Sequence, residues 1–164
     1  GSSKMVRERF TVSGGTRTIA SVAVRLYRYS GGSDLVLGIY SSGDVLQGSA
    51  ATISAAAIPT SGAPIAGADG SGPQRGSRWV IGALPTPVDL TNGSTYYLRL
   101  STASDTTYWC YVQRRLSYGY GNYTAATAFS DGVAQKTTNG GSTWTDLGSA
   151  TNQNDLQVAF LVAP

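Results

Sequence analysis

The stretch that decides the fold is IASVAVRLYRY, residues 19–29, in which apolar and polar side chains alternate. In an extended chain, Val22, Val24 and Leu26 share one face, and Arg25 and Tyr27 lie on the other. Side chains of a strand alternate between the two faces of its sheet, so this period of two predicts a strand with one buried face.

The same alternation returns along the chain, between segments that are rich in turn-forming residues. Leu35, Leu37 and Ile39 make the apolar face of the next predicted strand, which follows a glycine-rich turn at residues 30–34. Further strands are predicted at residues 45–53, 79–84, 95–100, 108–113 and 156–162. Because no segment sustains a helical period, we predict an all-β fold, an antiparallel β-sandwich of jelly-roll type with about eight to ten strands.

Length and composition favour one domain. A chain of 164 residues buries on folding roughly 70% of the surface that its unfolded chain exposes. A core of that size needs no metal or disulfide to be stable. We expect a basic N-terminal arm over residues 1–9, where Gly1 and Ser2 could be a cloning remnant, and a single β-sandwich domain over residues 10–164. Residues 54–78 are rich in Ala, Gly, Ser and Pro, which predicts a long loop with room for a short strand, and this loop either contacts a partner or serves as a spacer.

Titratable and nucleophilic side chains are sparse, and their pattern does not suit catalysis. The chain has no histidine, a single cysteine, Cys110, and a single glutamate, Glu8. Glu8 and the scattered turn aspartates do not suggest the facing carboxylates of a glycosidase, and Cys110 has no histidine to activate it. We therefore expect no catalytic residues, no metal centre and no cofactor, except that two turn aspartates with backbone carbonyls could hold a structural calcium ion.

Charge and hydropathy narrow the class of partner. The net charge is +3, from 12 basic and 9 acidic residues, and the basic residues are not concentrated in one run. Nucleic-acid binding is therefore not expected. No stretch approaches the roughly 20 apolar residues of a membrane span, and the N-terminal segment shows no apolar core of a signal peptide.

Aromatic side chains crowd between residues 108 and 123, interleaved with arginine. The predicted partner-binding residues in this segment are Trp109, Tyr111, Gln113, Arg114, Arg115, Tyr118 and Tyr120. Tyr97 and Arg99 join them, because both are predicted to point outward from the strand at 95–100. Such residues suit a protein interface or, as flat rings beside Arg and Gln, a platform for sugar rings. The alternative is a packed loop together with cross-strand Tyr–Arg stacking.

Four segments together resemble a known group of domains: IASV at 19–22, LVLGIY at 35–40, PVDLTNGSTYYL at 87–98 and GSTW at 141–144. The group consists of accessory β-sandwich domains with folds like those of carbohydrate-binding modules, including the choice-of-anchor type. Such domains occur in phage virion and tail proteins and in secreted bacterial proteins. The resemblance implies a jelly-roll fold and transfers no catalytic residue.

These observations lead us to expect a non-catalytic structural or interaction protein. The first expectation is a phage virion protein, a head-decoration or tail-associated subunit that forms homo-oligomers and contacts neighbouring subunits or the host surface. The alternative is a carbohydrate-binding module from a secreted glycan-degrading enzyme or an adhesin, whose partner is a glycan. Either expectation places the chain at the virion surface or outside the cell.

Overall fold

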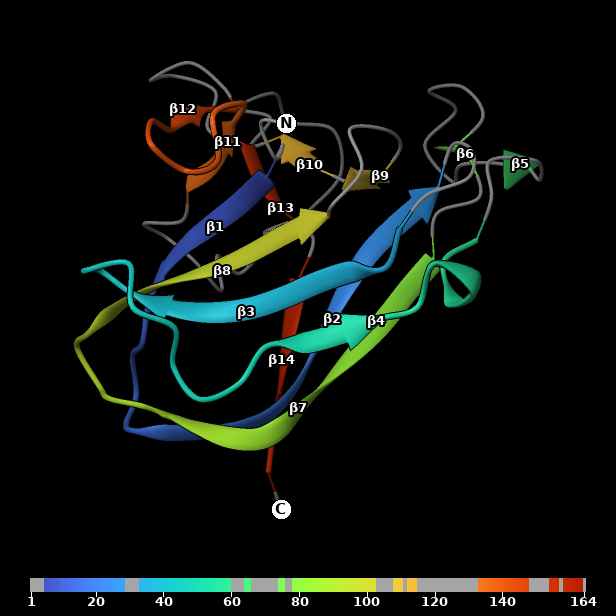
Figure 1. Cartoon of the computed structure of the whole chain (residues 1–164). Helices are drawn as coiled ribbons and strands as arrows, with labels where there is room; N and C mark the ends of the chain where they lie inside the picture. The colour runs from blue at the N-terminus through green and yellow to red at the C-terminus, as the bar shows by residue number, and fades with distance from the viewer. Residues whose placement is uncertain are drawn as a thin grey trace, which may run out of the picture.

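The computed structural model describes residues 5–28, 33–59, 64–65, 74–75, 78–102, 108–110, 112–114, 133–147, 154–156 and 158–163. Strands make up almost all of the regular structure in these segments, and the one helix among them is a short 3-10 turn, η1 (Ala55–Ala57). The principal strands form two antiparallel sheets (Figure 1). The predicted all-β fold is therefore confirmed.

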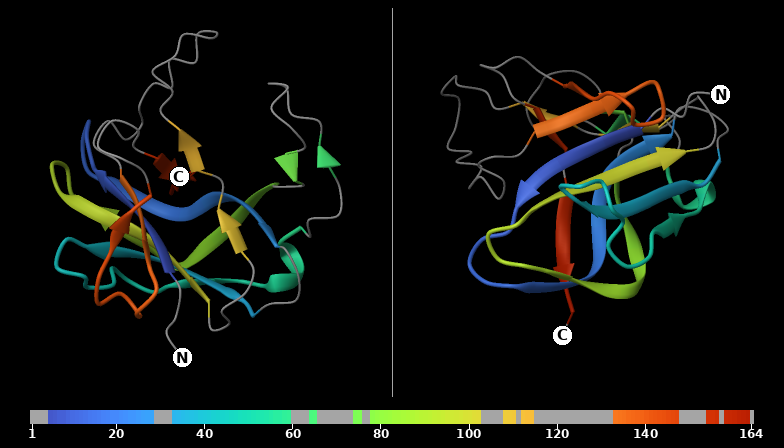
Figure 2. Two further views of the ribbon diagram at one scale, coloured as in Figure 1. Left: turned by 90° about the horizontal axis from the view of Figure 1, so that it is seen from above. Right: turned by 60° about the vertical axis from the view of Figure 1, so that its left-hand side comes forward.

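The larger sheet has six strands in the order β12-β11-β1-β8-β3-β4. Their bounds are β1 (Met5–Thr11), β3 (Leu35–Ser41), β4 (Ala51–Ile53), β8 (Thr95–Thr102), β11 (Val133–Thr137) and β12 (Thr145–Asp146). Figure 2 shows β1 lying between β11 and β8, although these strands are far apart in the sequence.

The smaller sheet has β2 at its centre. β2 (Arg17–Arg28) pairs with β14 (Val158–Val162) on one side and with β7 (Arg78–Leu90) on the other, and its last residues also pair with β9 (Tyr108–Cys110). Two minor pairs complete the described strands: β10 (Val112–Arg114) with β13 (Asn154–Leu156), and β5 (Pro64–Ile65) with β6 (Gln74–Arg75).

The hydrophobic core draws on the inner faces of both sheets. Val22, Val24 and Leu26 of β2 are fully buried, as the alternation of this stretch predicts. From the larger sheet, Ile39 of β3 and Leu98 of β8 belong to the same cluster. In the described part of the chain the two sheets form sandwich-like layers and do not close into a barrel, so the jelly-roll topology stays a prediction.

The N-terminal segment differs from its prediction as an arm. β1 begins at Met5, and it is an interior strand of the larger sheet rather than an extension beyond it. Glu8 and Phe10 point into the molecule and are buried, whereas Arg7 and Arg9 lie on the outer face and are only partly buried. The sequence pattern did not predict this strand, because the carboxylate of Glu8 occupies an inward-facing position where an apolar residue is expected.

Strand boundaries around the prolines and turns also differ. The strand predicted at 79–84 continues to Leu90. Pro85 and Pro87 are tolerated within it because they lie where the register with β2 shifts, so neither has to donate a backbone hydrogen bond to β2. The strand predicted at 45–53 is shorter, with one bridge between Tyr40 and Leu46 followed by β4. Within the loop predicted at 54–78, the described residues include η1, β5 and β6.

Candidate functional site

Five residues form a straight row across the outer face of the larger sheet. In strand order they are Asp146, Gln135, Arg7, Arg99 and Gly38, each paired in register with the next. Directly opposed residues of antiparallel strands have Cβ atoms about 4.5–5.5 Å apart. Two arginines are therefore held side by side at the centre of this row.

Aromatic rings lie against both arginines. The Cζ atom of Arg7 lies 4.0 Å from the ring centroid of Tyr97 and 4.1 Å from that of Trp144. The Cζ atom of Arg99 lies 3.9 Å from the ring centroid of Tyr40 and 5.3 Å from that of Trp144. We name the two arginines and the three rings the arginine–aromatic stack; its members are Arg7, Arg99, Tyr40, Tyr97 and Trp144. Each cation–π contact of this kind stabilises by about 0.5–2 kcal/mol, depending on how far it is shielded from water.

A tight turn after β11 positions Trp144. The buried hydroxyl of Thr137 donates to Asn139 Oδ1 (2.8 Å) and accepts from the backbone N–H groups of Asn139 (3.3 Å) and Gly141 (3.2 Å). Asn139 Oδ1 also accepts from the backbone N–H of Thr143 (3.0 Å), one residue before Trp144. These bonds fold the chain back over the sheet and bring the indole onto the two guanidinium groups.

Polar partners hold each arginine in its place. Arg7 Nε donates to Gln135 Oε1 (2.7 Å), and Gln135 Nε2 donates to Asp146 Oδ1 (2.7 Å). Arg99 Nη2 forms an ion pair with Asp44, whose side chain is 51% exposed while that of Arg99 is 11% exposed. The pair therefore joins a nearly buried cation to a carboxylate at the surface.

Burial lowers the pKa of Arg7, and the neighbouring guanidinium groups of Arg99 and Arg9 lower it further. The phenol of Tyr97 and the carboxylate of Asp146 act in the opposite direction. Positive charge is thus crowded around Arg7 in partly desolvated surroundings.

The predicted partner-binding residues fall into three groups. Tyr97 and Arg99 both belong to the arginine–aromatic stack, so the cross-strand stacking considered for them is present. Trp109 lies in β9 opposite Tyr27, and Gln113 and Arg114 lie in β10 opposite β13, but only their backbone is described. Tyr111, Arg115, Tyr118 and Tyr120 lie outside the described residues.

Three members of the stack are absent from the sequence prediction: Arg7, Tyr40 and Trp144. The predicted arm covers Arg7, and only the register of β1 with β8 places this residue opposite Arg99. Tyr40 directly follows the buried Ile39 in β3, so its outward direction was readable from the alternation. Trp144 lies outside any long strand, and no period in the sequence indicates where its ring lies.

A second surface of interest is the outer face of the smaller sheet, which is largely apolar. We name it the small-sheet face; its residues are Ser21, Ala23 and Arg25 of β2, Trp79, Ile81 and Ala83 of β7, and Ala159 and Leu161 of β14. Trp79 is 53% exposed, Ile81 60% and Leu161 40%. Arg25, opposite Trp79, is the one charged residue of this set.

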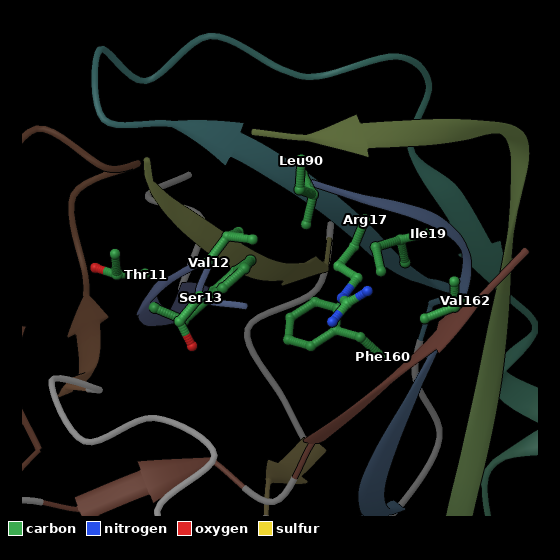
Figure 3. Close-up of a pocket in the computed structure, with 9 residues that line it drawn as sticks. Thr11, Val12, Ser13, Arg17, Ile19, Leu90, Phe160 and Val162 are labelled. Carbon is green, nitrogen blue, oxygen red and sulfur yellow. The ribbon is translucent and has the colours of Figure 1, made fainter. Parts of the chain in front are cut away.

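A pocket of roughly 180 Å³ opens where the two sheets part. Its apolar wall includes Phe10 and Phe160, whose ring centroids are 4.5 Å apart, together with Ile19 and Leu90. Figure 3 shows Arg17 projecting toward the ring of Phe160, beside Ile19, and its Nη2 donates to the carbonyl oxygen of Gly14 (3.0 Å). The pocket is an open end of the core with one cation at its rim.

Metal ligands and membrane-spanning helices are not found in the segments that the structure describes. Among those residues, no three His, Cys, Asp or Glu side chains come together as metal ligands would. No helix in the same segments has the length and apolar character needed to cross a bilayer.

Comparisons with protein-family models, with curated proteins and with solved structures each return no match. The resemblance to accessory β-sandwich domains therefore stays a prediction.

Proposed function

We propose that this chain is a non-catalytic assembly protein that associates with further copies of itself through the small-sheet face. The observation that carries the proposal is the exposure of Trp79, Ile81 and Leu161 on one face of three adjacent strands. Aromatic and large aliphatic side chains with an occasional arginine, and few carboxylates or lysines, are typical of the centre of a protein interface.

The arrangement of charge favours a second copy as the occupant. Arg25 lies toward one end of the face, and the exposed carboxylate of Asp89 lies on the outer side of β7 toward the other end. If two faces meet about a two-fold axis that crosses the strands, β2 of one copy runs antiparallel to β2 of the other. Arg25 of one copy then lies near Asp89 of the other copy. The uncharged residues between these two ends, such as Ala23 and Ile81, pack against their counterparts in the second copy.

The setting that we propose is a phage virion, in which the chain is a head-decoration or tail-associated subunit of jelly-roll topology. The resemblance of the sequence to β-sandwich domains of virion proteins supports this setting. The alternative, a carbohydrate-binding module, rests on Trp109 and Tyr111, whose side chains lie outside the described part of the structure.

The solution mass of the purified chain, measured by light scattering over a range of concentrations, tests the proposal. We expect a dimer or a larger even-numbered oligomer that dissociates on dilution. Ile81→Asp should yield a monomer, because it places a carboxylate in the centre of the apolar face. Val45→Asp is the matched control, since Val45 is 62% exposed and lies in the turn that follows β3 of the larger sheet.

Charge reversal tests the antiparallel arrangement. Arg25→Glu and Asp89→Arg should each weaken the oligomer, and the double variant should recover it, because the ion pairs across the interface are restored with opposite sign. A wild-type chain that stays monomeric at every concentration overturns the proposal. Equal dissociation by Ile81→Asp and Val45→Asp would show that association does not use the small-sheet face.

A further inference from the structure

The arginine–aromatic stack has hydrogen-bond donors that the described residues leave unused. Arg7 makes one hydrogen bond in the described part of the chain, from Nε to Gln135. Its two terminal nitrogens have no hydrogen-bond partner there, and for Arg99 the described contact is that of Nη2 with Asp44. A guanidinium carries five N–H donors, so most of the donors of Arg7 are available to a ligand.

The same arginines are fixed before any ligand arrives. The Cζ atom of each arginine lies close to the centroid of an aromatic ring, at 4.0 and 4.1 Å for Arg7 and at 3.9 Å for Arg99. Stacking occupies the faces of a guanidinium and leaves its edge, where the N–H groups point, free to bind. A preorganised arginine loses less conformational entropy on binding than a mobile one.

The charge around Arg7 favours an anion. The guanidinium groups of Arg9 and Arg99 are the like charges that act on Arg7, and Asp146 is the carboxylate that acts on it. Asp146 already accepts a hydrogen bond from Gln135, and Asp44 forms its ion pair with Arg99 rather than with Arg7. A negative group at the edge of Arg7 would therefore relieve the repulsion between the opposed arginines.

We propose that Arg7 and Arg99 form a binding site for an oxyanion, a carboxylate or sulfate group, on the outer face of the larger sheet. The anion would accept hydrogen bonds from the edge of Arg7, near the opposed guanidinium of Arg99, which already forms its own ion pair with Asp44. This site is independent of the small-sheet face and of self-association.

Titration of the ¹⁵N-labelled chain with sodium sulfate, with glucuronate and with neutral glucose tests this proposal. The readouts are the Nε–Hε cross-peaks of the arginines and the indole N–H cross-peak of Trp144, followed at constant ionic strength set with sodium chloride. We expect sulfate and glucuronate to shift the signals of Arg7 and Trp144 in a saturable way, and glucose to leave them unchanged. If glucuronate binds more tightly than sulfate, the ligand of the site is an anionic group carried by a sugar. If sulfate binds more tightly, the ligand is a free anion.

Three variants sharpen the test. Arg7→Gln should weaken binding at least about tenfold, because it removes a charge-assisted pair of donors. Asp146→Asn retains the acceptor for Gln135 but removes a competing charge, so it should strengthen binding about twofold to threefold. Arg17→Gln is the control, because Arg17 is exposed, bonds to Gly14 and lies away from the stack, at the pocket.

Two results would overturn the site. One is that Arg7 and Trp144 shift no more than the exposed Arg17 does throughout the sulfate and glucuronate titrations. The other is that glucose shifts them as much as glucuronate, because charge would then play no part in recognition. If Arg7→Gln fails to fold, the affinity of Asp146→Asn for the anion tests the proposal instead. Stronger binding in that variant supports the site, and weaker or unchanged binding contradicts it.

Discussion

Arg7 and Arg99 lie directly opposite each other on β1 and β8, and both guanidinium groups lie near the ring of Trp144. Two like charges at opposed positions of a sheet normally destabilise it. Here the rings of Tyr97, Tyr40 and Trp144 and the carboxylate of Asp44 provide compensating interactions. These contacts therefore offset the repulsion between the two arginines on the outer face of the larger sheet.

Trp144→Ala should lower the free energy of unfolding by about 2–3 kcal/mol, because it removes the ring that both arginines share and exposes the sheet beneath it. Trp79→Ala is the matched control and should cost less than about 1 kcal/mol, since Trp79 is already half exposed. Urea unfolding at a concentration where the chain is monomeric gives both values. Equal losses would mean that Trp144 contributes no more than an exposed ring.

Asp44→Asn and Asp44→Ala should separate charge from backbone strain. Asp44 has a φ of +65°, in the left-handed region that asparagine tolerates better than alanine. Loss of the ion pair with Arg99 should cost under about 1 kcal/mol in either variant, because the carboxylate is half exposed. Alanine should cost about 1 kcal/mol more through strain. High salt should reduce the loss of unfolding free energy caused by Asp44→Asn, because it screens the ion pair. The difference in unfolding free energy between Asp44→Asn and Asp44→Ala should persist in high salt. If that difference vanishes in salt, backbone strain is not its cause.

Gly38→Ala should destabilise the chain by about 1–2 kcal/mol, because the added methyl group would overpack the outer face. A Cβ atom at Gly38 would lie 2.9 Å from Leu46 Cδ1 and 3.0 Å from Tyr40 Cε2. Leu46→Ala should recover part of the loss by removing one of the two obstacles, while Tyr40 still supports Arg99. Thermal unfolding of the two single variants and the double variant measures the coupling, and strict additivity would show that Leu46 does not limit the space.

Thr137→Val should cost about 1–3 kcal/mol and loosen Trp144, because the buried hydroxyl organises the turn that carries the indole. Thr11→Val is the control; the hydroxyl of Thr11 shares a hydrogen bond with that of Thr95 at 3.1 Å and has no part in the turn. Near-ultraviolet circular dichroism should change in the first variant and not in the second. An unchanged spectrum in Thr137→Val would show that the turn is held by other contacts.

Alternation of side chains accounts for much of the predicted fold. Val22, Val24 and Leu26 are fully buried, and Tyr96, Leu98 and Leu100 of β8 are buried between outward-facing neighbours, as their period requires. This works because a strand has only two faces, so one buried face determines where every other side chain points. The same rule correctly places Tyr97 and Arg99 on the outside of β8.

The candidate site could be predicted only in part, because its members come from four separate segments of the chain. Tyr97 and Arg99 were readable from one strand, but Arg7 joins them through strand pairing over a long sequence separation, and Trp144 through a turn built on Thr137. Local patterns carry no information about which strand pairs with which. The N-terminal strand shows the same limit, since a buried carboxylate made a central strand look like a charged arm.

By itself, the sequence determined that this protein is built from strands and which side of β2, β3 and β8 is buried, because these properties depend on neighbours two residues apart. Only the tertiary structure decided that β1 lies between β11 and β8, that Arg7 meets Arg99, and that Trp144 lies against both. Those relationships depend on the register between distant strands, which arises from the packing of the whole core and from no single segment of the chain.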